Sequence, residues 1–505
     1  MNRKTGVILS YVLMIFEVLS TLLLTPFIIR SLGQAEYGVY RLSASINAYL
    51  LLLDLGVGNA IIRFIAKYRV EKNKKMERQF LGVAISYYSI IALIAIIGGC
   101  ILISIFPTAF AKGLNSNEIA LGQRLLGITM LNTAVTLGTA TFNNVLIAYE
   151  RFAISRGASI VQIILRMLLT YIVVRMGMGS VGIVTVNLCM TIICRSFFVA
   201  YVLWCIKLKP MFRGIRIAFI KEIIAYSSLI LLQMVATQIN ATVDQILIGA
   251  LVDAAAVVIA VYGVGTQIVQ YFQSLGSSFN GVLMPGIVRL VENGGTAERI
   301  CDEMVRIGRI IFMLLGLIWT CFLLYGKQFV ILWAGEKNTD AYYVSAILMT
   351  AYLFILTESI GTQVLWAKNQ HKEQSILKLV IVVVNILLTV ALIKWNPLLG
   401  ATIGTFISLM LGDVVVMNWV FVKKIGISLK RYYGSLLKGI VPCLIITGIV
   451  GQAIKIIRFD SWLWLGGHII VVCLCYVGLL WIIGLNRYEK DLIKKMIFRK
   501  REKKA

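Results

Sequence analysis

The stretch FLGVAISYYSIIALIAIIGGCILISIF at residues 80–106 contains no charged side chain. Its apolar residues are nearly continuous, so they would cover every face of a helix rather than one stripe. A helix of about 20 such residues crosses the hydrocarbon core of a bilayer, and it satisfies its own backbone hydrogen bonds there. The stretch therefore predicts a transmembrane helix.

Similar stretches recur along all 505 residues, of which 59% are hydrophobic and 14% are charged. The mean hydropathy is +0.88, and little remains to build the charged surface of a soluble protein. We expect an all-α membrane protein with about fourteen transmembrane helices, the first of them retained rather than removed as a signal peptide. The expected helices are 7–29, 38–62, 80–106, 119–148, 154–175, 180–206, 222–250, 255–283, 307–333, 342–367, 375–394, 399–422, 435–455 and 462–485.

The basic residues predict the orientation of these helices. The chain has 49 Lys and Arg against 23 Asp and Glu, a net charge of +26. Most of the bases fall in every second connection, beginning with residues 63–78 and 207–221. Because Lys and Arg gather in cytoplasmic loops, both termini are expected in the cytoplasm. The excess of bases therefore reflects membrane orientation, and no nucleic-acid partner is expected.

The connections on the other side of the membrane are short, the longest spanning about residues 107–118. A membrane glycosyltransferase or polymerase would need a catalytic acid in a substantial outer loop, so we expect no enzyme and no catalytic residue. The nine cysteines form no CxxC pair, and the two histidines, His371 and His468, are far apart. No metal site is expected from this pattern.

The chain also repeats itself weakly at an offset near 220 residues. NNVLIAYERF at 143–152 aligns with TQVLWAKNQH at 362–371. The repeat predicts two six-helix lobes in parallel orientation, followed by a terminal helix pair, an architecture in which transporters bind substrate between the lobes. The expected parts are an N-lobe at 1–209, a C-lobe at 210–424, the last two helices at 425–485 and a basic cytoplasmic tail at 486–505. The tail is expected to lie on the membrane surface as an amphipathic helix.

Charged residues inside the expected helices are the first functional candidates, because each costs at least ~2.5 kcal/mol to insert. Arg166 and Arg195 are expected to bind the phosphate or pyrophosphate oxygens of a substrate through their planar guanidinium groups. The alternative for each is a structural pair with an acid such as Glu17 or Asp413. Lys378 and Lys394, near the helix ends, are expected to extend toward the interface.

The acids inside the helices are the candidates for binding a coupling proton or sodium ion, and no other cofactor is expected. They are Glu17, Asp54, Asp244, Glu358 and Asp413.

Polar residues that share a helix face extend the candidate substrate cavity. Residues four apart lie on one face of a helix, so Asn187 and Thr191 line up with Arg195, and Gln233 and Asn240 line up with Asp244. Gln267 marks a further stripe. The alternative is that these stripes form hydrogen bonds between helices that only hold the bundle together.

Two local patterns resemble a known family. IIRSLGQAEYGVYRL at 28–42 and DLGVGNAIIRFIAKY at 54–68 resemble the bacterial polysaccharide-export flippases of the Wzx type, in the multidrug/oligosaccharidyl-lipid/polysaccharide (MOP) superfamily. The resemblance implies a multi-pass protein of the bacterial cytoplasmic (inner) membrane. It would move polyprenyl-pyrophosphate-linked oligosaccharide to the outer leaflet by alternating access, for O-antigen, capsule or exopolysaccharide synthesis.

The resemblance also implies partners in the same membrane, a polysaccharide polymerase and a chain-length regulator, besides membrane lipid itself. Two other activities of the superfamily stay open from the sequence. One is an ion-coupled drug or cation antiporter, with Glu17, Asp54 or Asp244 holding the cation. The other is a lipid II flippase, which the two patterns do not separate from a polysaccharide flippase.

Overall fold

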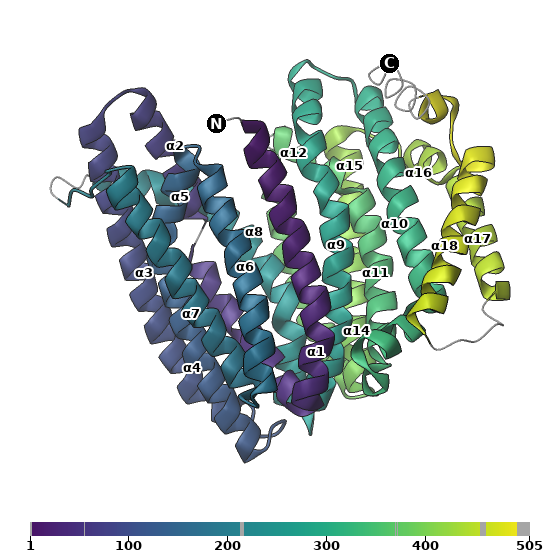
Figure 1. Cartoon of the computed structure of the whole chain (residues 1–505). Coiled ribbons are helices and arrows are strands. Elements are labelled where there is room, and N and C mark those ends of the chain that lie inside the picture. The colour runs from purple at the N-terminus through teal and green to yellow at the C-terminus, as the bar shows by residue number, and fades with distance from the viewer. Residues whose placement is uncertain are drawn as a thin grey trace, which may run out of the picture. The chain divides into compact units, whose positions relative to one another are not determined.

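The computed structural model describes residues 3–54, 56–212, 217–368, 370, 372–454 and 461–491, without the side chains of 3–8, 11, 217–233, 279–285, 372 and 373. These residues form helices and connecting turns, with no strand in the described ranges (Figure 1). The helical fold predicted from the sequence is therefore confirmed.

In chain order the helical segments are α1 (Arg3–Leu51), η1 (Leu52–Asp54), α2 (Val57–Val70), α3 (Lys74–Ala109), α4 (Ser116–Gly138), α5 (Ala140–Ala148), α6 (Phe152–Arg175), α7 (Gly179–Ala200), η2 (Tyr201–Cys205), α8 (Ile217–Leu251), α9 (Ala255–Glu292), α10 (Ala297–Ala334), η3 (Glu336–Asn338), α11 (Ala341–Thr357), α12 (Ser359–Ala367), α13 (Lys372–Ile393), α14 (Pro397–Leu409), η4 (Met410–Val416), α15 (Met417–Ile425), α16 (Leu429–Leu437), α17 (Ile440–Ile454), α18 (Trp462–Leu479) and η5 (Leu480–Gly484). The segments η2, η4 and η5 are π-helical turns within longer helices.

The helices are long and apolar enough to cross a membrane many times. Ten qualify in the described ranges, or twelve if the bent pairs α11–α12 and α16–α17 each count as one span. Every expected helix coincides with helical structure, and the first two meet within α1, which breaks at Gly33. The count of fourteen crossings and the orientation stay predictions. The expected tail helix lies mostly outside the described residues, which end at 491.

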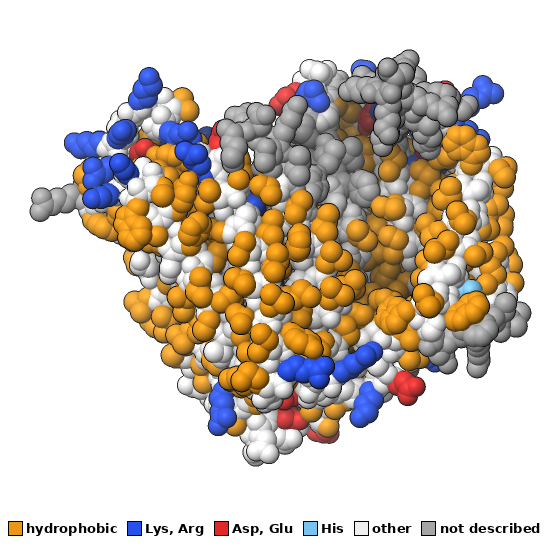
Figure 2. Space-filling view, in the orientation of Figure 1, with side chains coloured by type: hydrophobic (Ala, Val, Ile, Leu, Met, Phe, Trp, Pro, Cys, Tyr) orange, Lys and Arg blue, Asp and Glu red, His pale blue; other side chains and the backbone are white. Residues whose placement is uncertain are grey.

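One face of α3 shows how the surface suits lipid. Its apolar side chains repeat at helical spacing and are exposed: Ile90, Leu93, Ile94, Ile97, Ile101 and Ile105. Figure 2 shows hydrophobic side chains covering the helices between their ends, with Lys and Arg gathered at the helix ends. An exposed apolar surface of this extent is unfavourable in water and matches the hydrocarbon of a bilayer.

The described chain forms two compact units. Unit 1 comprises Met1–Gly263 and Val382–Ala401, and unit 2 comprises Val264–Ile381 and Thr402–Ala505. In unit 1, α3 packs on α4, α6 on α7, and α1 on both α4 and α6 (Figure 1). In unit 2, α10 packs against α11, α16, α17 and α18. The lobe boundaries expected at 209, 424 and 485 stay predictions.

The two halves of the chain repeat a local feature of the helices. The short helices α5 and α12 begin at Ala140 and Ser359 and end at Ala148 and Ala367, so both ends are 219 residues apart. Each follows a one-residue break in a longer helix, at Thr139 and Glu358 respectively. This correspondence agrees with the repeat read from the sequence.

The segment at 28–42 has a structural explanation inside unit 1. Gly33 has φ +77°, a conformation that favours glycine, and it divides α1 into two helical parts. Glu36 Oε1 accepts hydrogen bonds from the backbone nitrogen of Ser180 at 2.6 Å and from its hydroxyl at 2.7 Å, at the start of α7. A carboxylate there binds free backbone N–H groups and faces the positive end of the helix dipole.

Gly38 brings α1 against the start of α9. A Cβ added at Gly38 would lie 1.8 Å from the carbonyl oxygen of Ala256. We expect Gly38→Ala to lower the free energy of unfolding by about 1–3 kcal/mol, because the backbone must shift to relieve the overlap. Thermal unfolding of the purified protein in detergent measures the effect.

Gly157 supplies the control, since it lies in α6 and an added Cβ would meet nothing within 4 Å. Alanine favours a helix over glycine by up to about 1 kcal/mol, so Gly157→Ala should be neutral or stabilising. Equal unfolding temperatures for the two variants would contradict the close approach of α1 to Ala256.

Candidate functional site

A ladder of polar side chains joins α8 to α13 inside unit 1. Asn385 Nδ2 donates to Asn240 Oδ1 at 3.2 Å, and Thr389 Oγ1 donates to Asp244 Oδ1 at 3.1 Å. Each helix contributes two residues four apart, which places them on one face and allows two successive rungs. We call these four residues the polar ladder. The sequence predicted Asn240 and Asp244 as one stripe, and the structure adds their partners.

Asp244 is the most enclosed member of the polar ladder. Its side chain is 3% exposed. The Tyr262 hydroxyl of α9 donates to Asp244 Oδ2 at 2.5 Å, so both carboxylate oxygens accept hydrogen bonds. This arrangement suits an ionised carboxylate. Together with the hydroxyl of Thr389 and the amide oxygens of the ladder, Asp244 offers the oxygen ligands that hard cations prefer.

Arg166 belongs to a second group in unit 1. It is half-buried on α6, which packs on α1, the helix of Arg41. The Arg41 side chain packs against Gly263 of α9, where an added Cβ would lie 2.8 Å from Nε. Arg41 and Arg166 therefore lie half-buried on two helices that pack together, and we call them the arginine pair.

Arg195 lies apart from the arginine pair on α7. It is half-buried, and its guanidinium carbon is 5.9 Å from the ring centroid of Phe198. Along the same helix Asn187 is half-buried and Thr191 is buried. In the described part of the chain neither Arg166 nor Arg195 forms an ion pair. The expected alternative of a structural pair with Glu17 or Asp413 is therefore not seen among these residues.

The other candidates in unit 1 differ in their surroundings. The Tyr88 hydroxyl donates to Asp54 Oδ1 at 2.5 Å, which ties the end of η1 to α3. Glu17 is exposed on α1, where its backbone carbonyl accepts from the Thr21 hydroxyl at 2.9 Å. The side chain of Gln233 lies outside the described residues.

Two further acids and Gln267 lie in unit 2. Asp413, on the π-turn η4, pairs with Lys378 of α13 at 2.6 Å. Lys378 was expected to extend to the interface, and that expectation is wrong because the side chain turns to this acid instead. Glu358 is 3% exposed at the break between α11 and α12. Gln267 is half-buried on α9. It belongs to unit 2, whereas Asp244 belongs to unit 1.

Sequence reasoning missed two arginines. Arg41 was passed over because it lies near the end of an expected helix, although its position inside 38–62 was a usable signal. Arg309 is 4% exposed and makes a two-point ion pair with Glu489, with Nε–Oε1 at 2.7 Å and Nη2–Oε2 at 3.1 Å. Nothing local in the sequence predicts its partner, which lies 180 positions away.

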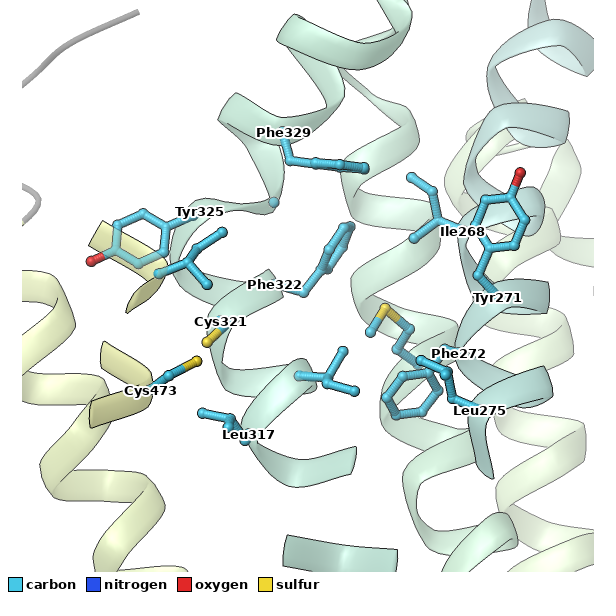
Figure 3. A pocket seen from close by; sticks show the side chains of 14 residues that line it. Ile268, Tyr271, Phe272, Leu275, Leu317, Cys321, Phe322, Tyr325, Phe329 and Cys473 are labelled. Atoms are coloured by element: carbon cyan, nitrogen blue, oxygen red, sulfur yellow. The ribbon is translucent and has the colours of Figure 1, made fainter. Parts of the chain in front are cut away.

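Unit 2 also contains an apolar pocket of about 330 Å³ between α9, α10, α11 and α18. Figure 3 shows Phe272, Phe322 and Phe329 along this pocket, with Cys321 and Cys473 directed toward one another on its other side. Its walls offer almost no polar atoms, so it suits hydrocarbon rather than a charged group.

The helices and the apolar surface are those of a multi-pass membrane protein. Two solved structures share the fold at low sequence identity, which establishes the fold alone. One is a lipid II flippase MurJ in an inward closed conformation, 16% identical, with TM-score 0.75 over 97% of this chain and 99% of that chain. The other is an inward-facing multidrug resistance MATE family transporter of the MOP superfamily, 15% identical, with TM-score 0.64 over 81% of this chain and 94% of that chain.

The chain belongs to the polysaccharide biosynthesis protein family, whose model matches residues 4–291, more than half of the sequence. A search of curated proteins found no match. The polysaccharide family was expected from the segments at 28–42 and 54–68, and the multi-pass membrane location from the apolar helices; both are confirmed.

Proposed function

We propose that the protein translocates polyprenyl-pyrophosphate-linked oligosaccharide from the cytoplasmic to the outer leaflet for surface polysaccharide synthesis. The observation that carries the proposal is the arginine pair, two half-buried arginines on the packed apolar helices α1 and α6 of a polysaccharide biosynthesis family protein. Guanidinium groups bind phosphate oxygens through paired hydrogen bonds, and keeping them inside a membrane is costly without such a role.

Transport would proceed by alternating access, with the lipid tail remaining in the bilayer while the charged head crosses. Arg166 and Arg195 would contact the head group, and Asn187, Thr191, Asn240 and Gln267 would line the polar route. Arg41 joins them because it is half-buried on α1, which packs on the helix of Arg166. A polysaccharide polymerase and a chain-length regulator would act on the product in the same membrane.

Coupling to an ion gradient would use the polar ladder. Asp244 is a buried carboxylate with hydroxyl and amide oxygens around it, a ligand set that accepts a proton or a sodium ion. Ionisable residues inside membranes commonly mark such ion pathways. Glu17, Asp54, Glu358 and Asp413 remain candidates for the same role.

A second candidate function is an ion-coupled antiporter of organic cations. The buried acids Asp244 and Glu358, each 3% exposed, favour it, because a cationic substrate needs a carboxylate in its site. The fold is also that of a lipid II flippase, whose substrate shares the polyprenyl-pyrophosphate chemistry, so the arginine pair would serve that substrate equally.

The head-group role of Arg166 predicts a loss of transport on substitution. In cells whose chromosomal copy is deleted, we expect Arg166→Ala to restore at least about tenfold less surface polysaccharide than the unchanged protein, since a charge-assisted hydrogen bond contributes about 1.5–3 kcal/mol. Arg166→Lys should restore only part, because a lysine keeps the charge and loses the paired geometry. Quantitative staining of extracted surface polysaccharide measures the effect.

The matched control is Arg175→Ala, which removes an exposed arginine from the end of the same helix. Arg175 lies near the rings of Phe27 and Tyr171, so its loss should leave polysaccharide near the normal amount when both proteins accumulate equally. If Arg166→Ala restores as much polysaccharide as Arg175→Ala, Arg166 does not bind the head group.

A further inference from the structure

A buried acid, Glu358, lies at the break between α11 and α12 in unit 2, and forming such a break does not require an acid. The two helices meet at Glu358 with a bend of 40°. The matching break between α4 and α5 has Thr139 at the equivalent position, where the hydroxyl donates to the Val135 carbonyl at 2.5 Å. Because a neutral threonine serves the break in unit 1, the carboxyl of Glu358 needs a different explanation.

Glu358 forms a closed set of hydrogen bonds with Asn418 and Tyr433. Asn418 Nδ2 donates to Glu358 Oε2 at 3.0 Å and to the Tyr433 hydroxyl oxygen at 2.7 Å. The Tyr433 hydroxyl in turn donates to Glu358 Oε1. Both carboxylate oxygens therefore accept, which is the pattern of the ionised form.

The ionised form is nevertheless poorly neutralised at this place. Among the described residues no Lys, Arg or His forms an ion pair with Glu358. The carboxylate of Asp413 interacts electrostatically with Glu358. The nearby Lys378 forms its ion pair with Asp413, at 2.6 Å, and not with Glu358. The other titratable neighbours of this set are Tyr432 of α16, beside Glu358, and Cys301 of α10, which acts on Tyr432. Burial without a cationic partner opposes the charged form of a carboxylate, whereas its hydrogen bonds support that form, so such a group can exchange a proton.

A second observation identifies where the proton would be accommodated. Asn418 is 5% exposed, and its Oδ1 is buried with no hydrogen-bond partner in the described structure. A buried acceptor without a donor is unfavourable by about 1–3 kcal/mol. Turning the Asn418 amide over would present Oδ1 to Glu358, where a protonated Oε2 would supply the missing donor.

We propose that Glu358 is a proton-binding site and that its protonation state determines how it hydrogen-bonds with Asn418 and Tyr433. In the ionised state both neighbours donate to the carboxylate. When a proton binds Oε2, the carboxyl group becomes a donor to Asn418 Oδ1, and Tyr433 continues to donate to Oε1. No bond other than that to the proton forms or breaks.

The site connects the helix break to the amphipathic helix α16. Tyr432 and Tyr433 both belong to α16, and the Tyr432 hydroxyl donates to the Thr357 carbonyl at the break, at 3.4 Å. Arg431 of α16 pairs with Asp302 of α10 at 2.9 Å. A change in the protonation of Glu358 therefore alters the hydrogen bond between the break and Asn418 of α15, and with it the bond from Asn418 to Tyr433 of α16, a helix that α10 also holds. The inference stands independently of which molecule is transported.

The test is infrared difference spectroscopy of the purified full-length protein in lipid nanodiscs, titrated from acidic to alkaline pH. We expect the titrating carbonyl signal of protonated carboxylic acids to contain one component that is present in the unchanged protein and lost in Glu358→Gln. Glu303→Gln, which removes an exposed surface carboxylate, should leave that component in place. A titrating carbonyl signal that is the same in Glu358→Gln as in the unchanged protein would overturn the assignment.

Tyr433→Phe keeps the test decisive should Glu358→Gln fail to fold. This variant loses a hydrogen bond that favours the ionised carboxylate, so the component should persist to higher pH by about one unit. An unchanged titration in Tyr433→Phe would overturn the proposal. Because these readouts need no substrate, they can fail while the proposed translocation holds, and the reverse is equally possible.

Discussion

Arg309→Ala is expected to produce the largest loss of stability of any single substitution considered for this protein. Beyond its two contacts with Glu489, the guanidinium group donates from Nη1 to the carbonyl oxygens of Ser435 and Lys438, both at 2.9 Å. From Nη2 it donates to the Gly484 carbonyl at 2.7 Å. One side chain of α10 thus holds the α16–α17 connection, the end of η5 and the segment that follows.

Removing the guanidinium group leaves the Glu489 carboxylate buried without its charge partner, and four backbone carbonyls, that of Leu436 included, lose a donor. Breaking a buried pair in this way costs about 3–5 kcal/mol. The expected result is a markedly lower unfolding temperature in detergent, with loss of the protein in cells. Arg309→Lys should recover only a fraction, because an ammonium group cannot reach all of these acceptors at once.

Arg306→Ala provides the control for this prediction. Arg306 lies one turn away on α10, and its pair with Glu303 at 3.1 Å is exposed. Exposed pairs contribute about 0–1 kcal/mol, so this variant should unfold close to the unchanged protein. Similar unfolding temperatures for Arg309→Ala and Arg306→Ala would contradict the anchoring role of Arg309.

Asp244→Asn is expected to have the largest effect on transport. The amide keeps the size of the carboxyl group and much of its hydrogen bonding with Tyr262 and Thr389, but it cannot carry the charge that binds a proton or sodium ion. In liposomes with an imposed gradient, we expect the gradient-driven rate to fall at least about tenfold, a change of about 1.4 kcal/mol in the barrier. The rate without a gradient should change much less.

Asp253→Asn is the matched control, since Asp253 is an exposed acid in the turn between α8 and α9. It should respond to proton and sodium gradients as the unchanged protein does. If Asp244→Asn keeps a full response to both gradients, the polar ladder is structural and another acid carries the coupling ion.

The helices were predictable because their signal is local. Each expected segment is continuously apolar over the width of a bilayer, as at 80–106, and each coincides with helical structure. The repeat was predictable for a related reason, because the short helices α5 and α12 carry the aligned sequence motifs themselves.

The partners of the buried charges were not predictable, because they are far away in the sequence. Asp244 meets Thr389 across 145 positions, and Arg309 meets Glu489 across 180. Composition shows that a buried charge must have a partner, but only packing of the helices selects which one. Lys378 illustrates this limit. Its position near a helix end favoured the membrane interface, but its side chain forms an ion pair with Asp413 on η4.

The most direct test of the proposed function is the transbilayer movement of a fluorescent polyprenyl-pyrophosphate oligosaccharide in liposomes that contain only the purified protein. Quenching from outside reports how much substrate has crossed. We predict rapid crossing in protein-containing liposomes, slowed by Arg166→Ala and unaffected by Arg175→Ala. No crossing of this lipid, together with gradient-driven movement of a cationic dye, would contradict the account and establish the antiporter instead.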